Sequence, residues 1–307
     1  MELVLSSLTK ALVNEERALQ IGLENELDSA GVFVDSTCLK ANMHFPVDWV
    51  LLRDRVRTLV KSIIVIRRHG LRERISEPAA FISSVNALTT EADVILARMN
   101  NVIMQLPDAR RQAHERIIGE RAVPSGQKIL SLYENDVHII VRGKAGADVE
   151  FGNSLLVAET REGFILDHEL LKEQSGGDAK WLRGRLKELK DLSGERLVEV
   201  TADRGFESAA LKRDLLDAGL ECHVCPKSPA ELECRLEEES FRSNLRRRAQ
   251  TEGRIGILKN AFLGGIPKAK GYENRQVAVA WAVLAHNLWW VARKKWKEAE
   301  HDLLQAA

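Results

Sequence analysis

The sequence predicts an α/β protein in which a mixed β-sheet is flanked by helices. The chain has 307 residues, of which 45% are apolar, so it is long and apolar enough to bury a substantial core. Strand-like and helical patterns follow one another as strand, hairpin, helix, strand, helix, strand and helices, which is typical of a sheet covered by helices. A helical block at about 46–120 interrupts this order between the first strand and the hairpin.

The N-terminal half is expected to contain one strand and a long helical insertion. Residues 1–29 form an N-terminal helical segment in this interpretation. GVFVDSTCL (31–39) is rich in β-branched residues and alternates in polarity, which predicts a strand. From Pro46 onward the apolar residues recur at helical spacing. Two further strand-like runs come next: KILSLY (128–133) and HIIVRG (138–143).

The C-terminal half continues with a hairpin and alternating helices and strands. The runs 148–159 and 163–171 flank Thr160-Arg161-Glu162-Gly163, a turn containing glycine. Gly219 is placed where a helix would end. The remaining predicted elements are helices at 177–192 and 207–220, and strands at 196–206 and 221–227.

The most apolar stretch, VAVAWAVLAHNLWWVA (277–292), is too short to span a bilayer comfortably and contains polar residues. We interpret it as a buried C-terminal helix, with Trp281, Trp289 and Trp290 in the core rather than on a stacking surface. No signal peptide is recognisable, and four cysteines do not make a disulfide scaffold. A reducing, cytosolic setting is therefore expected.

The charge of the chain is balanced overall but clustered locally. Forty-five basic residues face 45 acidic ones. Segment 53–75 nevertheless carries eight Lys or Arg against two acids, and 242–259 carries six against Glu252 alone. Such clusters attract phosphates. For 53–75, the interleaved aliphatic residues favour a packed amphipathic helix over a phosphate-binding surface.

Three acids stand at positions where a sheet protein collects functional groups. Asp35 lies on the first strand, Asp203 at the end of a later strand, and Glu252 on a helix after the last strand. Functional groups gather at the carboxyl ends of strands in open α/β sheets. Enzymes that act on phosphodiesters use convergent carboxylates to hold Mg²⁺. We therefore expect these three acids to converge at one edge of the sheet.

The helix that carries Glu252 has two interpretations. Arg248, Glu252 and Lys259 are four and seven residues apart and so share one helix face. This triplet is common in solvated helices with i,i+4 ion pairs. It also suits a site where a metal, a phosphate and the protein meet.

Four stretches together resemble the DDE transposases of bacterial insertion sequences. They are VDSTCLKANMHFPVD (34–48), RGKAGADVEFGNSLLVAE (142–159), TADRGFES (201–208) and RRRAQTEGRIGILKN (246–260). The resemblance implies an RNase H-like catalytic domain over 30–298 and a C-terminal tail at 299–307. It also implies that Asp35, Asp203 and Glu252 are the catalytic metal ligands for two Mg²⁺ ions, with Mn²⁺ as a substitute.

By the same resemblance, Arg248, Lys259 and Arg254 would support the acids or hold phosphate and DNA. The implied activity is metal-dependent cleavage of DNA at the ends of an insertion sequence, followed by attack of the freed 3′-hydroxyl on target DNA. The implied partners are element ends and target DNA, with a homodimer as the active form and no membrane. The implied location is the bacterial cytoplasm, at the nucleoid.

The chain departs from the family pattern at two places. Leu245 stands where the family signature begins with tyrosine, and only 34 residues precede Asp35 where a helical DNA-recognition region is usual. The second departure predicts a truncated element. The alternative hypothesis is therefore a catalytically incompetent remnant that only binds DNA.

Other polar residues receive structural interpretations. Cys222-His223-x-Cys225 resembles half a zinc site, but residues three apart in a strand point to opposite faces, so structural zinc is disfavoured. Glu150 is expected to hold the hairpin, and Asp48 to lie in the first turn of a helix, where it favours the dipole.

Overall fold

The computed structural model describes residues 28–43, 46–68, 90–131, 134–144, 147–173, 177–193, 196–268 and 270–306. The predicted N-terminal helix lies almost wholly outside them, as does 69–89 of the helical block. The chain divides into two compact units. One contains the residues up to Asn42 together with His138–Ala307, and the other is Met43–Val137.

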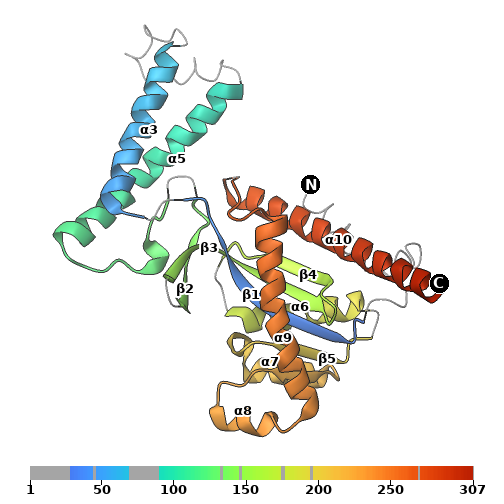
Figure 1. The fold of residues 1–307 in the computed structure, drawn as a ribbon. Coiled ribbons are helices and arrows are strands. Elements are labelled where there is room, and N and C mark those ends of the chain that lie inside the picture. Colours follow the sequence, from blue (N-terminus) through green and yellow to red (C-terminus); the bar gives the residue numbers. More distant parts are fainter. Residues whose placement is uncertain are drawn as a thin grey trace. The chain divides into compact units, whose positions relative to one another are not determined.

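The first unit is built on a mixed sheet in which, within the described residues, six strands pair (Figure 1). The order is β2-β3-β1-β5-β6, and β4 also pairs with β3. β1, β5 and β6 are parallel, whereas β3 is antiparallel to β1, β2 and β4. The strands are β1 Gly31–Lys40, β2 His138–Lys144, β3 Ala147–Thr160, β4 Ile165–Leu170, β5 Glu199–Ala202 and β6 Glu221–Val224.

The register of β1 against β5 sets the geometry of the predicted acid cluster. Gly31 pairs with Glu199, and the pairing continues to Val34 with Ala202. One step further, the same register puts Asp35 beside Asp203, just where β5 ends. β1 continues beyond that point along β3, where Asp35 pairs with Val157. Asp35 therefore lies in a continuous strand at the carboxyl end of its shorter neighbour.

Helices cover both faces of this sheet, as the sequence predicts. Val32 and Val34 pack with Leu182 and Leu211 on one face, whereas Leu39 packs with helical residues on the other face. Strand residues two apart share a face, so Asp35 lies on the same side as Leu39. The helices of the unit are α6 Gly177–Leu192, the 3₁₀ turn Arg204–Phe206, α7 Ala209–Asp217, α8 Pro229–Arg235, α9 Glu239–Ile257, the π-helical turn Leu258–Phe262 and α10 Tyr272–Ala306.

The predicted hairpin is confirmed. Gly163 donates its N–H to the carbonyl of Thr160 at 3.0 Å and has φ +97°, a conformation that glycine adopts most easily. Lys40 and Glu150 form an ion pair of 3.0 Å between β1 and β3, which agrees with the structural role expected for Glu150. The second hairpin strand is shorter than predicted, and so is β5, which ends before Asp203.

The second unit is helical. Its elements are α3 Asp48–Arg68, α5 Thr90–Ala113, the π-helical turn His114–Ile118 and the 3₁₀ turn Ser125–Gln127. Asp48 lies in the first turn of α3, as predicted, and is buried beside Gln112, whose Nε2 donates to Asp48 Oδ1 at 2.7 Å. Arg116 adds an ion pair of 2.8 Å to the same carboxylate.

The strand predicted at 128–133 is wrong over the described residues 128–131. There the backbone of Ile129 bonds to a side chain instead of a neighbouring strand. Its N–H donates to Gln112 Oε1 at 2.7 Å, and its carbonyl accepts from Gln112 Nε2 at 3.3 Å. A glutamine on α5 therefore replaces the strand partner that the apolar pattern of this segment suggested.

The C-terminal helix α10 is longer and more exposed than predicted. Asn287 is fully buried against the sheet, where it accepts from the N–H of Ile165 at 3.1 Å. Trp281 and Trp289, however, remain 52% and 43% exposed, so their assignment to the core is wrong. No helix among the described residues is both long enough and apolar enough to cross a bilayer.

Candidate metal and phosphate site

Asp35 is the buried centre of the candidate site. Its side chain faces α9, its residue is 6% exposed, and its Oδ1 accepts from the N–H of Ser36 at 2.7 Å. Burial raises the pKa of Asp35 to about 6, and the nearby carboxylates of Asp203 and Glu252 also raise it. The Ser36 N–H and the Arg248 guanidinium act in the opposite direction. The groups that stabilise the ionised carboxylate therefore do not offset its burial and the neighbouring acids.

Asp203 is fixed at the end of β5 by a local cap. It precedes the 3₁₀ turn Arg204–Phe206, and its Oδ1 accepts from the Gly205 N–H at 2.8 Å. A Cβ at Gly205 would lie 3.0 Å from this oxygen, so the turn needs glycine for the close approach. The cap occupies one carboxylate oxygen of Asp203, which holds the side chain still beside Asp35.

Helix α9 brings Glu252 and Arg248 to the same place. Arg248 Nη1 lies 3.3 Å from Glu252 Oε1 and 3.8 Å from Asp35 Oδ2. One guanidinium thus links two acids that are far apart in the sequence. The Glu252 side chain is 61% exposed, in contrast to buried Asp35. Solvent and ligands can therefore reach the cluster from the Glu252 side.

Lys259 extends this basic edge along β1. Its Nζ donates to the carbonyl of Cys38 at 2.8 Å and to Thr37 Oγ1 at 3.3 Å. Thr37 is two residues beyond Asp35 and therefore on the same face of the strand. The helix face predicted to carry Arg248, Glu252 and Lys259 thus lies against β1. Arg248 and Glu252 are near Asp35, and Lys259 is near Thr37 and Cys38, further towards the C-terminal end of β1.

The three acids do not crowd around a single point. Within the described part of the chain, the three ligand-type side chains with atoms all within 4.8 Å of one another are Glu199, Glu221 and His223. Asp35, Asp203 and Glu252 are spaced more widely than that. At least one pair of these acids is therefore more than 4.8 Å apart.

Arg254, which was expected with Arg248 and Lys259 to hold DNA or phosphate, lies away from these acids. Two residues on an α-helix are about 200° apart, so Arg254 points away from the Glu252 face. Its Nη1 donates to Glu159 Oε1 at 3.2 Å, and its guanidinium lies against Gly163. The structure therefore separates Arg254 from Arg248 and Lys259.

Ser36 and Asp178 adjoin the cluster and were missed by the sequence analysis. Ser36 Oγ donates to Asp178 Oδ2 at 2.6 Å, and this oxygen is 3.7 Å from the position of a Cβ on Gly205. Asp178 thus lies just behind the loop that carries Asp203. The sequence offers little signal for it, because an acid in the first turn of a helix is common without any functional role.

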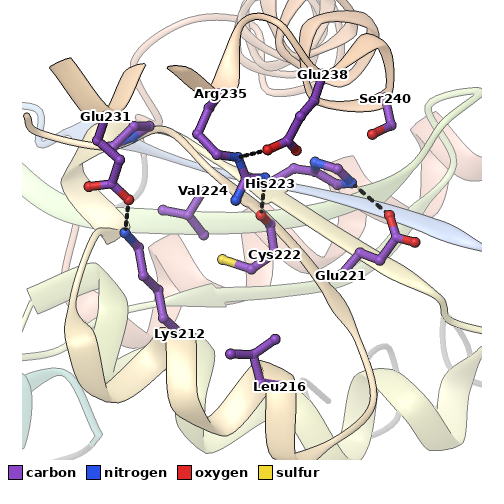
Figure 2. Close-up of a pocket in the computed structure, with 11 residues that line it drawn as sticks. Lys212, Leu216, Glu221, Cys222, His223, Val224, Glu231, Arg235, Glu238 and Ser240 are labelled. Carbon is purple, nitrogen blue, oxygen red and sulfur yellow. Dashed lines mark hydrogen bonds and ion pairs between the residues drawn. The ribbon is translucent and has the colours of Figure 1, made fainter. Parts of the chain in front are cut away.

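A second polar cluster lies at the start of β5 and β6, beside a pocket of about 320 Å³ (Figure 2). His223 Nε2 is 3.3 Å from both Glu199 Oε2 and Glu221 Oε2. This donor set suits a transition metal better than Mg²⁺. However, Glu199 already accepts from Arg161 Nη2 and Asn244 Nδ2, each at 2.6 Å.

The hydrogen bonds to Glu199 account for its acidity. The bond with His223 is the largest influence that lowers the pKa of Glu199 to about 2, and Asn244 and Arg161 add to it against the effect of burial. Glu199 is therefore well supplied with hydrogen-bond donors. Cys222 and Cys225 are free thiols, and among the described residues they do not belong to the group of potential metal ligands around His223.

The fold and the acid cluster define an α/β protein with a mixed sheet and helices on both faces, in which Asp35 on β1, Asp203 after β5 and Glu252 on α9 lie near the carboxyl end of β5. The chain matches no protein-family model, and it matches none of the curated proteins with which it was compared.

Proposed function

We propose that this protein is a DDE-type transposase with an RNase H-like fold, which cleaves and joins DNA strands with the help of divalent metal ions. The observation that carries the proposal is that the Arg248 guanidinium contacts both Asp35 and Glu252. This contact lies at the edge of the sheet where Asp203 follows β5. The order and spacing of the four motifs support the same assignment.

The donor set fits hard divalent cations. Three carboxylates offer oxygen ligands only, as Mg²⁺ and Mn²⁺ prefer. Burial is the main cause of the raised pKa of Asp35, and the carboxylates of Asp203 and Glu252 add to it, so a bound cation would stabilise the ionised carboxylate. Asp35, Asp203 and Glu252 would together hold the ions. When bound, the ions would acidify a water molecule and stabilise the charge on the attacking and leaving oxygens.

The protein groups would orient the DNA strand and hold the acids. Ser36 and Gly205 donate backbone N–H groups to Asp35 and Asp203, which leaves the other carboxylate oxygens for ligands. Arg248 and Lys259 would contact phosphate on either side of the cleaved bond. A water oxygen attacks phosphorus and the bond to the 3′ oxygen breaks. The resulting 3′-hydroxyl would then attack a phosphodiester of the target DNA, the target's own P–O3′ bond would break, and its 3′ oxygen would leave with a proton.

The test is nicking of supercoiled plasmid by the purified chain in Mg²⁺ or Mn²⁺. Asp35→Ala, Asp203→Ala and Glu252→Ala should each reduce nicking to background while circular dichroism stays unchanged. Glu221→Ala is the matched control, because it removes an acid from the other cluster and should leave nicking intact.

Two results would contradict the proposal. Nicking that survives in all three variants would exclude these acids as the catalytic residues, and nicking lost only with Glu221→Ala would assign it to the other cluster. DNA binding without any nicking by the wild-type chain would favour the binding-only remnant. Such binding should weaken with salt, because phosphate contacts release counterions.

A further inference from the structure

A pocket of about 420 Å³ lies among α9, the β3–β4 turn and α10, and its lining combines tryptophan with basic residues. Trp289 and Trp290 contribute the aromatic surface. The basic lining residues are Arg254, Arg293, Lys294 and Lys297, and Glu162 is the acid among them. The volume lies in the range of small-ligand pockets. Cations beside the exposed indole ring of Trp289 require an explanation beyond core packing.

Trp289 is held in place and yet remains accessible. Its ring meets Phe262 edge to face, with the ring centroids 6.0 Å apart, and His286 lies at 6.2 Å. The residue is 43% exposed, and the Arg293 guanidinium carbon is 5.1 Å from the ring centroid. The Trp289 indole is therefore held by Phe262 and His286, has the Arg293 guanidinium beside it, and still remains partly exposed to solvent.

Trp290 forms the more rigid wall of the pocket. Its Nε1 donates to the carbonyl of Glu162 at 3.2 Å, and its ring meets Phe164 edge to face at 5.5 Å. These contacts fix it to the β3–β4 turn. Of the two tryptophans, Trp289 therefore has the ring surface that a ligand can contact.

The basic residues differ in how far they are neutralised. Arg254 pairs with Glu159 at 3.2 Å, and Lys294 with Glu162 at 3.3 Å. Arg293 and Lys297 are exposed and form no ion pair with the residues that the structure describes. The uncompensated charge is thus positive and adjacent to Trp289, which calls for an anionic group beside an aromatic one.

We propose that this pocket binds a nucleotide of a single-stranded nucleic acid, with the base against Trp289 and the backbone phosphate beside Arg293 and Lys297. Proteins that bind single strands combine aromatic side chains with a basic surface in this way. In a duplex the bases are stacked on one another and cannot reach the indole face. An acidic peptide would use the cations but not the ring. The inference goes beyond the proposed function, since it involves none of the three acids.

The experiment measures anisotropy of a labelled oligothymidylate of about 15 nucleotides, with a duplex of equal length for comparison. EDTA is present throughout. Trp289→Ala should weaken single-strand binding about tenfold, because stacking on one aromatic side chain contributes about that much affinity. Trp281→Ala is the matched control, because Trp281 is 52% exposed on the same helix but does not line the pocket.

The basic residues are tested by salt dependence. The double variant Arg293→Gln with Lys297→Gln should lower the slope of log affinity against log salt by about 1.4, because each phosphate contact to a single strand contributes about 0.7. The control removes two exposed charges from α6, Lys180→Gln with Lys187→Gln, and should leave the slope unchanged.

Equal binding by the Trp289→Ala and Trp281→Ala variants would overturn the proposal, and so would the absence of single-strand binding. Displacement by thymidine monophosphate at the concentration of the strand itself would also overturn it, by assigning a free nucleotide instead. Strand binding is measured in EDTA and nicking in Mg²⁺ or Mn²⁺, and the two experiments use different substitutions. A failed nicking test and a failed binding test are therefore distinguishable.

Discussion

The two ends of the central strands treat acidic side chains in opposite ways. At the start of β5, Glu199 receives hydrogen bonds from three partners, and its pKa falls to about 2. At the end of β5, Asp35 is buried near two other acids, and its pKa rises to about 6. Both carboxylates lie on the face covered by α9, a few residues apart along adjacent strands. Asp35 is the more deeply buried of the two, and burial is the main cause of its raised pKa, whereas hydrogen-bond donors are the main cause of the lowered pKa of Glu199.

The difference separates an anchoring function from a binding function. The saturated end fastens α9 to the sheet through charged networks around Glu199 and Glu159. At the other end, which we call the undersupplied end, the acids around Asp35 have fewer hydrogen-bond donors. The negative charge gathered there is unfavourable for folding and favourable for binding cations. Three substitutions test this contrast, one at each network of the saturated end and one at the undersupplied end.

Glu159→Gln should have the largest effect on stability. Glu159 is 2% exposed, and its Oε1 accepts from Arg247 Nη2 at 2.9 Å and Thr251 Oγ1 at 2.8 Å. Removing its charge leaves the buried Arg247 without its counter-ion, which should cost about 3 to 5 kcal/mol in urea unfolding at neutral pH. Glu162→Gln, which removes an exposed acid from the neighbouring turn, should cost less than about 1 kcal/mol. Equal losses would mean that the network around Glu159 does not anchor α9.

Glu199→Gln should destabilise the protein somewhat less, and in a pH-dependent manner. A pKa lowered from 4.5 to about 2 means that the stabilisation is complete above the unfolded value and disappears as the pH falls through 2. At one pKa unit per 1.4 kcal/mol, the loss at pH 7 should be about 3 kcal/mol. Urea unfolding at several pH values measures it. Glu221→Gln is the control, since its more exposed carboxylate contacts the same histidine. A loss for Glu199→Gln that persists below pH 2 would contradict the ionic explanation.

Sequence patterns predicted the strands and helices that carry these acids better than they predicted which charged groups surround each acid. β1, the hairpin, α6 and the acids at strand ends follow from β-branched runs, turn residues and helical spacing. The register that sets Asp35 beside Asp203 depends on pairing between distant strands, which local patterns do not contain. Over the described residues 128–131, the strand expected at 128–133 was lost to a side chain on α5. The exposure of Trp289 depends on which face of an almost uniformly apolar helix meets the sheet.

The polar partners were the least predictable part of the site. Glu199, His223 and Asn244 come from two strands and α9, and no spacing in the sequence indicates that they meet. Asp178 is similarly hidden at the start of α6, where an acid needs no special reason. Arg254 shows the converse, because it shares the basic segment with Arg248 but faces another part of the molecule. Segment charge predicted a basic helix, and only the packing of α9 divides its cations between two sites.

Asp35→Asn should have the smallest effect and the opposite sign. The pKa of Asp35 is raised from 3.8 to about 6, so its contribution is favourable below the unfolded value and is lost as the pH rises through 6. In EDTA at pH 8 the variant should therefore be more stable than the wild type by about 2 kcal/mol, somewhat below the full value of the pKa shift because the amide is also buried. Near pH 4 the two proteins should unfold at the same urea concentration.

Addition of Mg²⁺ at pH 8 should then stabilise the wild type but not the variant, because only a site with an ionised Asp35 gains from the ion. A stability difference that is independent of pH, or an equal response of both proteins to Mg²⁺, would show that Asp35 is an ordinary buried acid and would remove the contrast between the two ends of β5.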